Sequence, residues 1–284
     1  MDQLQNWLSD NKIPIGDWIA EFVDAINGNG FFDAVSTGLG ALIDGFTNVL
    51  ESVPPFVLIL VIAVGVFVFK RNWKLSVFIA LALLFIFNQG YWTETLETLS
   101  LIIYATAVCM IIGVPVGIAA AHRPWLFNAL RPLLDLMQTL PTFVYLIPTL
   151  VLFGLGAVPG LISTIIFALP APIRLTHLGV SSVPEPLLEA GKAFGASKSQ
   201  LLWKVELPHA LPTIMAGLTQ CIMLSLSMVV IAALVGAGGL GVPVVRALNS
   251  VRIDMGFEAG LSIVVLAIIL DRICRPADAD KRKV

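Results

Sequence analysis

Long runs of apolar residues, separated by short polar stretches, dominate this chain and leave few folds open to it. They are longer than the strands of an outer-membrane barrel, which cover about ten residues and alternate in polarity. We place seven runs, at residues 56–69, 75–88, 95–121, 139–155, 161–177, 213–235 and 257–273. The sequence therefore predicts an all-α, polytopic transmembrane helical bundle with about seven spans. The two shortest runs, 56–69 and 75–88, either take up flanking residues to cross roughly 30 Å of hydrocarbon or form one re-entrant hairpin.

Composition excludes most soluble alternatives. Hydrophobic residues make up 57% of the 284 positions and charged residues only 13%, about half the roughly 25% of a typical soluble domain. A soluble chain of this length has too little interior to bury that much apolar surface. We therefore exclude a soluble enzyme, a nucleic-acid-binding protein and a disordered scaffold. No cofactor or metal is expected, because no disulfide or metal-ligand spacing occurs among Cys109, Cys221, Cys274, His122, His177 and His209.

The distribution of basic residues predicts the orientation of the bundle, because lysine and arginine favour the cytoplasmic side of a membrane. With the N-terminus outside and the C-terminus inside, 14 of the 17 lysines and arginines are cytoplasmic, and only Lys12, Arg246 and Arg252 lie outside. Residues 273–284 then form a basic cytoplasmic tail. The first residues lack the basic start and apolar core of a signal peptide. We expect a multi-pass protein of the bacterial inner membrane.

Residues 1–53 form a block of different composition ahead of the first apolar run. The block holds eight acidic residues and one basic residue, and its apolar residues recur with helical spacing, as at Trp18, Phe22 and Ile26. A second amphipathic stretch covers about 31–50. We expect an extracytoplasmic tail of amphipathic helices. The tail either anchors the protein in the outer leaflet as a scaffold, which is our preferred interpretation, or orients an arriving binding protein by its negative charge.

The longest connection on the predicted cytoplasmic side, residues 183–208, is the most informative segment. Pro184 and Pro186 are placed to open a short helix. Gly195 suits the position after that helix, where the backbone turns through positive φ, and Ser197 can cap a second helix. Leu207-Pro208 is expected to end the second helix, because the residue before a proline avoids the helical region. Such a compact, partly apolar helix pair is suited to docking another protein.

Part of this 183–208 loop resembles the EAA motif of ABC importer permeases. That motif reads E-A-A, three residues, G, nine residues, I, one residue, L-P, and this chain has glycine for the second alanine and valine for isoleucine. The matching positions are Glu189, Ala190, Gly191, Gly195, Val205, Leu207 and Pro208. The resemblance implies that the loop docks on a cytoplasmic ATPase and couples ATP hydrolysis to transport. Glu189 and Gly195 are the positions to which we chiefly assign that role.

Further segments resemble the branch of these permeases that serves glycine betaine, proline betaine and choline. They are 137–148, 153–160, 167–174 and 226–232, within an overall match of about 92–272. The resemblance implies a MetI-like type I ABC importer permease fold, with two N-terminal transmembrane helices in 54–92 and the importer core in 93–272. It also implies two permease copies, two ATPase copies and a periplasmic substrate-binding protein. This subunit would be a non-catalytic permease that imports quaternary ammonium solutes by alternating access, for osmoprotection or catabolism.

Two alternatives stay open, namely a related permease for another small solute such as an amino acid, and an ion-coupled secondary carrier. The carrier is disfavoured, because such proteins keep ionisable groups at mid-membrane and the apolar runs hold almost none. The chain has no G-x-x-x-x-G-K-[ST] motif, so a partner must hydrolyse ATP. The stretch 236–241 fits G-x-G-x-x-G but follows an apolar run instead of a strand, and we expect a tight turn at the outer mouth.

Prolines inside the apolar runs suggest where a transport pathway lies, because broken helices are tolerated only beside protein or a water-filled cavity. Aromatic rings near them either attract a quaternary ammonium ion by cation–π contact or simply pack. The candidate pathway residues are Pro141, Phe143, Tyr145, Pro148, Pro170 and Pro172. Gly113 and Gly117 flank Pro115, which predicts either a flexible joint or close helix packing.

Overall fold

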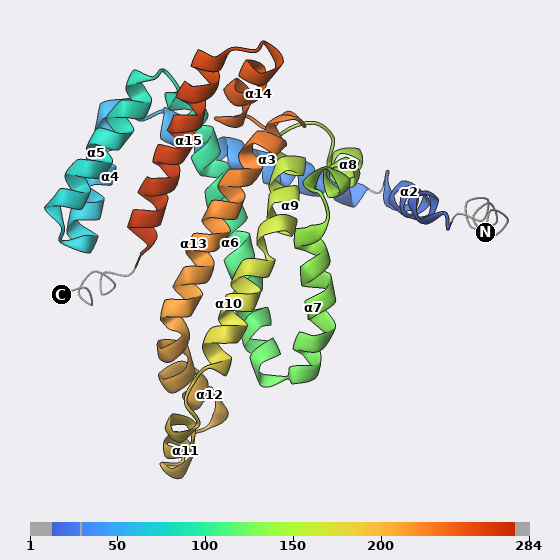
Figure 1. The fold of residues 1–284 in the computed structure, drawn as a ribbon, viewed down its shortest axis with the longest axis vertical. Coiled ribbons are helices and arrows are strands. Elements are labelled where there is room, and N and C mark those ends of the chain that lie inside the picture. Colours follow the sequence, from blue (N-terminus) through green and yellow to red (C-terminus); the bar gives the residue numbers. More distant parts are fainter. Residues whose placement is uncertain (1–12, 29, 276–284) are drawn as a thin grey trace, which may run out of the picture.

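The computed structural model describes residues 13–28 and 30–275, where every regular element is a helix (Figure 1). The first helices are α2 (Ile15–Ile26), α3 (Gly30–Glu51), α4 (Pro55–Lys70) and α5 (Trp73–Asn88). They are followed by α6 (Trp92–His122), α7 (Pro124–Thr139), α8 (Thr142–Phe153), α9 (Ala157–Ala168) and α10 (Pro170–Ser181). The chain continues with α11 (Glu185–Ala193), α12 (Lys198–Leu201), the π-helical turn η1 (Leu202–Glu206), α13 (Leu207–Ala233), α14 (Gly241–Asn249) and α15 (Ile253–Cys274). The prediction of an all-helical fold is confirmed.

Candidate membrane spans can be defined by helix length and composition. Four stretches are long and apolar enough by themselves, namely α6, α9 with α10, α12 through α13, and α15. Two more reach the required length only as bent pairs, α3–α4 with an angle of 98° and α7–α8 with an angle of 92°. The described residues thus hold four to six candidate spans plus the shorter apolar helix α5. The number seven and the orientation of the bundle stay predictions.

The span expected at residues 139–155 is only part of the bent pair α7–α8. The chain turns sharply after α7, where Leu140 is extended with ψ 133°, because the residue before a proline avoids the helical region. The apolar run is therefore mainly α8, which points away at 92°, and it is α7 that runs along the bundle (Figure 1). Hydropathy missed α7 because Arg131 and Asp135 lie within it.

The centre of the bundle is a close-packed group of α6, α10 and α13 (Figure 1). An added Cβ at Gly113 would lie 2.8 Å from Pro172 Cγ, and one at Gly117 would lie 2.6 Å from Thr176 Cβ. These glycines therefore let α6 approach α10 more closely than any side chain would allow. Of the two readings of the Gly113–Gly117 segment, the structure supports packing, since α6 continues as one 31-residue helix through Pro115.

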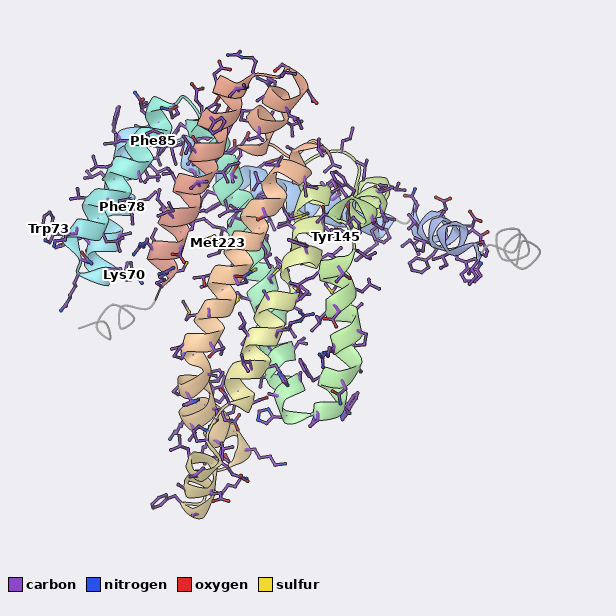
Figure 2. All side chains as sticks on the ribbon, in the orientation of Figure 1. Lys70, Trp73, Phe78, Phe85, Tyr145 and Met223 are labelled. Atoms are coloured by element: carbon purple, nitrogen blue, oxygen red, sulfur yellow. The ribbon has the colours of Figure 1, made fainter. Side chains whose placement is uncertain are left out.

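Helices α4, α5 and α15 form a second group beside this centre, joined to it by shared apolar contacts. Lys70 Nζ donates a hydrogen bond of 2.6 Å to the Arg275 carbonyl oxygen, which ties the α4–α5 turn to the end of α15 (Figure 2). Trp73, Phe78 and Phe85 of α5 are 63%, 44% and 38% exposed. Such an exposed aromatic face is suited to contact with lipid.

Helix α3 lies across the bundle, at the end away from the 183–208 loop (Figure 1). Thr47 Oγ1 donates to Ser100 Oγ of α6 at 2.9 Å, and Ser36 Oγ donates to the Phe153 carbonyl oxygen at 2.9 Å. The two amphipathic helices predicted for the N-terminal block are confirmed as α2 and α3. In α2, Trp18 and Phe22 are 58% and 65% exposed, so most of its apolar face is uncovered within the described residues, apart from contact with α8.

Candidate coupling and transport site

The 183–208 loop forms one extremity of the bundle, with α11 and α12 projecting beyond the ends of α4, α5 and α15 (Figure 1). Helix α11 ends on Gly195, whose φ is +77°. The Gly195 N–H donates to the Lys192 carbonyl at 2.9 Å, and the Ala196 N–H donates to the Gly191 carbonyl at 3.0 Å. These two bonds form a Schellman cap, which needs a left-handed residue at the glycine position. The predicted turn at Gly195 is confirmed.

The second helix of the loop begins as predicted but does not end as predicted. Ser197 caps it, accepting from the Gln200 N–H at 3.3 Å while its own N–H donates to Gln200 Oε1 at 2.8 Å. The expected stop at Leu207-Pro208 is wrong, because α12, η1 and α13 form one continuous helix. In the π-helical turn, the Leu207 N–H bonds to the Leu202 carbonyl five residues back. The missing N–H of Pro208 then falls where the ordinary helical ladder is already interrupted.

The EAA-motif positions are spread over both arms of the loop. Gly191 lets the arms touch, since an added Cβ there would lie 2.5 Å from Leu201 Cδ2, with Val205 Cγ2 next at 3.9 Å. Leu207 is half-buried at the start of α13. The remaining motif residues besides Gly195 are exposed, namely Glu189, Ala190 and Pro208. The motif glycine at 191 therefore has a packing role within the loop, while Glu189 is free to meet a partner.

Large apolar side chains stand exposed on this loop. Phe194 is 93% exposed, Trp203 68% and Leu187 47%. Charged residues surround them, and the exposed ones include Glu185, Glu189, Lys192, Lys198 and Lys204. Large exposed apolar side chains among charged ones, on a capped helix pair, are typical of a protein-binding surface.

The candidate pathway residues fall into two groups with different surroundings. Near the α7–α8 bend, Phe143 is 53% exposed, and the buried Tyr145 hydroxyl has no hydrogen-bond partner among the described residues (Figure 2). Pro141 caps α8 and Pro148 lies inside it. Pro170 and Pro172 are instead buried at the start of α10, where Pro172 packs against α6 and α13. A role of these residues in the pathway stays a prediction.

Helix α7 carries a polar stripe that the sequence analysis missed. Asn128, Arg131, Asp135 and Gln138 recur at intervals of three and four residues, which places them on one helix face. Arg174 of α10 bridges to this face, donating to Asp135 Oδ1 at 2.5 Å and to Gln138 Oε1 at 3.2 Å. Charged groups within a membrane bundle normally face water or protein. The spacing of these four residues was the signal that could have revealed the stripe.

A glycine-rich turn closes the opposite end of the bundle, between α13 and α14. Gly236 and Gly239 have φ values of +90° and +97°. The Gly239 N–H donates to Glu97 Oε2 at 2.5 Å, and the Leu240 N–H donates to Thr98 Oγ1 at 2.8 Å. The expected tight turn is confirmed. Because α6 side chains occupy these N–H groups, they are not available to hold a phosphate. No group of three or more metal-ligating side chains occurs in the part of the chain that the structure describes.

Comparison with known proteins places these features in a family. Residues 113–282 match the family described as binding-protein-dependent transport system inner membrane component. The chain is 43% identical over 265 residues to the glycine betaine/carnitine transport permease protein GbuB of Listeria monocytogenes, covering 92% of this chain and 94% of the relative. It is 44% identical over 279 residues to the glycine betaine/proline betaine transport system permease protein ProW of Escherichia coli, covering 95% and 77%.

A solved structure matches the fold as well. A chain of the MetNI methionine ABC transporter, in an inward facing conformation, aligns with a TM-score of 0.56 and 25% identity over 63% of this chain and 91% of that chain. The chain belongs to the family of binding-protein-dependent transport system inner membrane components, the multi-pass permease subunits of ABC transporters, and has their MetI-like fold.

Proposed function

We propose that this protein is the permease subunit of an ATP-driven importer for glycine betaine and related quaternary ammonium solutes. The observation that best supports this proposal is the 183–208 loop, a capped helix pair at the extremity of the bundle with Phe194 and Trp203 exposed. The substrate class is inferred from the relatives, which are permease proteins for glycine betaine with carnitine or proline betaine.

In this proposal, a cytoplasmic ATPase binds the exposed apolar patch of the loop and supplies the free energy of transport. Glu189 and Lys192 lie at the rim of the patch, where charge sets the orientation of a partner more than its affinity. ATP binding and hydrolysis shift the permease between outward- and inward-facing states by favouring one state over the other. The functional unit has two permease copies, two ATPase copies and a periplasmic substrate-binding protein that delivers the solute.

The orientation we propose has the N-terminus outside and the C-terminus in the cytoplasm, which places the 183–208 loop beside the ATPase. The glycine-rich turn and α3 then lie on the side where the binding protein arrives. A cysteine introduced at Asp17 should react with an impermeant label added to intact cells, and one at Lys281 should not. Labelling at position 281 but not at 17 would refute this orientation.

The polar stripe of α7 supports a hydrophilic pathway along that helix. Glycine betaine carries a positive and a negative charge, and transfer of either through pure hydrocarbon is costly. Asp135 and Arg174 present one charge of each sign, and their side chains are 54% and 35% exposed. We therefore add the stripe to the candidate pathway, next to Phe143 and Tyr145 of α8.

Reconstitution tests the proposed function. Proteoliposomes that hold the permease, its ATPase and the binding protein should accumulate labelled glycine betaine only when ATP is hydrolysed, and unlabelled proline betaine or choline should compete. Uptake driven by an ion gradient without ATP would select a secondary carrier. Uptake of an amino acid with no competition from betaines would select a permease for another small solute.

A further inference from the structure

One close contact, between the buried Glu206 and the half-exposed His122, joins the 183–208 loop to the long helix α6. Glu206, the last residue of η1, is only 8% exposed, and its Oε2 lies 2.8 Å from Nε2 of His122 at the end of α6. The contact is one of proximity, since this oxygen makes no hydrogen bond of good geometry with any residue that the structure describes. The other ring nitrogen of His122, Nδ1, lies 3.0 Å from the Ile118 carbonyl oxygen. His122 is thus held between its own helix and the Glu206 carboxylate.

The π-helical turn η1 sets the register that buries Glu206. Glu206, Ala210 and Ile214 lie one turn apart on the buried face of the helix, and they are 8%, 0% and 7% exposed. In an uninterrupted α-helix, the residues three and four positions before Glu206 would continue that face. The wider turn brings Leu201 there instead, at 6% exposure, and leaves Trp203 68% exposed. The π-helical turn therefore directs Glu206 towards α6 and leaves Trp203 on the exposed side of the loop.

Apolar packing beside the pair fixes the surrounding helices to one another. Val180 of α10 and Ala210 of α13 belong to one buried cluster with residues of α6, including Ile118 and Ala121. An added Cβ at Gly179 would lie 3.1 Å from Ala210 Cβ, so α10 and α13 are in close contact here. The His122–Glu206 pair is a polar contact beside this cluster, at the end of the loop that joins α13.

The other end of α6 holds the glycine-rich turn. Glu97 and Thr98, in the second turn of α6, accept the hydrogen bonds from Gly239 and Leu240. A helix rises about 1.5 Å per residue, so the 31 residues of α6 form a rod of roughly 46 Å. This rod connects the loop that projects at one end with the turn that closes the other.

We propose that Glu206 and His122 are positioning residues that carry movement of the docked 183–208 loop into α6, and so couple ATP hydrolysis to opening at the far end. This inference rests on the proposed function and deepens it. This role of Glu206 is separate from the EAA motif, because the motif specifies no residue type at the position between Val205 and Leu207. The contact of the buried Glu206 carboxylate with His122 attaches the end of the loop to α6 at one defined point.

The test compares variants of the full transporter in proteoliposomes. Glu206→Met removes the charge and the polar contact with His122 at similar volume, and Glu206→Gln keeps a polar group beside His122. His209→Gln is the matched control, since His209 is an exposed histidine on the same helix. The measured quantity is solute molecules imported per ATP hydrolysed, with the amount of ATPase that co-purifies measured in parallel.

We expect Glu206→Met to bind the ATPase normally and to import about tenfold less solute per ATP, because the loop loses its polar contact with α6. Glu206→Gln should recover most of the ratio, and His209→Gln should match the wild type. His122→Gln should lower the ratio as well, and the double variant with Glu206→Met should be no worse than the poorer single variant, because both remove one contact. His122→Gln also serves as the test if Glu206→Met does not fold.

Three outcomes would overturn the inference. A wild-type ratio in Glu206→Met and His122→Gln would exclude a role in coupling. Loss of bound ATPase in both variants would show that the pair only maintains the loop. Additive losses in the double variant would show that the two residues act separately. If instead the wild type shows no ATP-dependent import, the proposed function fails first, so the two failures can be told apart.

Discussion

Replacing Gly195 by valine should weaken ATPase docking without disturbing the membrane helices. Gly195 has a φ of +77°, a conformation that costs a residue with a Cβ about 1–2 kcal/mol and is least tolerated by β-branched side chains. No atom lies within 4 Å of an added Cβ at this position, so the penalty is one of backbone conformation and involves no clash. The ratio of molecules with α11 correctly turned onto α12 to those without this turn should fall by a factor of roughly 5 to 30.

Gly195→Asn is the matched control, because asparagine enters the left-handed region far more readily than valine. ATPase would be titrated onto each purified permease, and the concentration for half-maximal binding would be measured together with solute uptake. The valine variant should need roughly 5 to 30 times more ATPase than the wild type, the asparagine variant should stay close to it, and the unfolding temperature in detergent should not change. Equal binding by the valine and asparagine variants would refute the backbone argument.

Three further changes test other parts of the structure. Gly117→Ala should destabilise the permease by about 1–3 kcal/mol through overpacking against α10, seen as a lower unfolding temperature, whereas Gly65→Ala, with no atom within 4 Å of the added Cβ, should not. Asp135→Asn and Arg174→Gln should each lower uptake with little change in stability, because a partly exposed ion pair contributes at most about 1 kcal/mol; unchanged uptake would remove the α7 stripe from the pathway. Deleting residues 1–50 should lower the amount of assembled complex and leave the apparent affinity for substrate unchanged, and a greater requirement for binding protein would show that the tail recruits it.

The 183–208 loop shows which features a sequence determines locally. The caps at Gly195 and Ser197 were predictable, because each depends on residues within four positions of it. The continuation through Pro208 was not, because the π-helical turn before it is stabilised by contact of Glu206 with His122 on another helix. The all-helical fold was predictable for a more general reason, since long apolar runs in lipid must satisfy their backbone groups internally.

Helix α7 shows the limit of hydropathy. A window that averages over neighbours sees Arg131 and Asp135 as a polar loop and assigns the span to the apolar residues that follow. Only the folded structure reveals that Arg174, on α10, pairs with Asp135. The polar stripe is thus explained by partners distant in the sequence, whereas the bend after α7 is explained locally by Pro141.

The crosswise helix α3 constrains the order in which the protein can be assembled. The hydrogen bond from Ser36 to Phe153 joins residues 117 positions apart, and ribosomes add about 5–20 residues per second, so roughly 6–23 s separate the synthesis of its two ends. Through most of that interval α3 is already synthesised, but the helices it will pack against are incomplete. Its interfacial amphipathic character allows it to wait at the bilayer surface during this time. Helix α3 is therefore synthesised early but packed late. It can reach its final position only against a bundle that already contains α8.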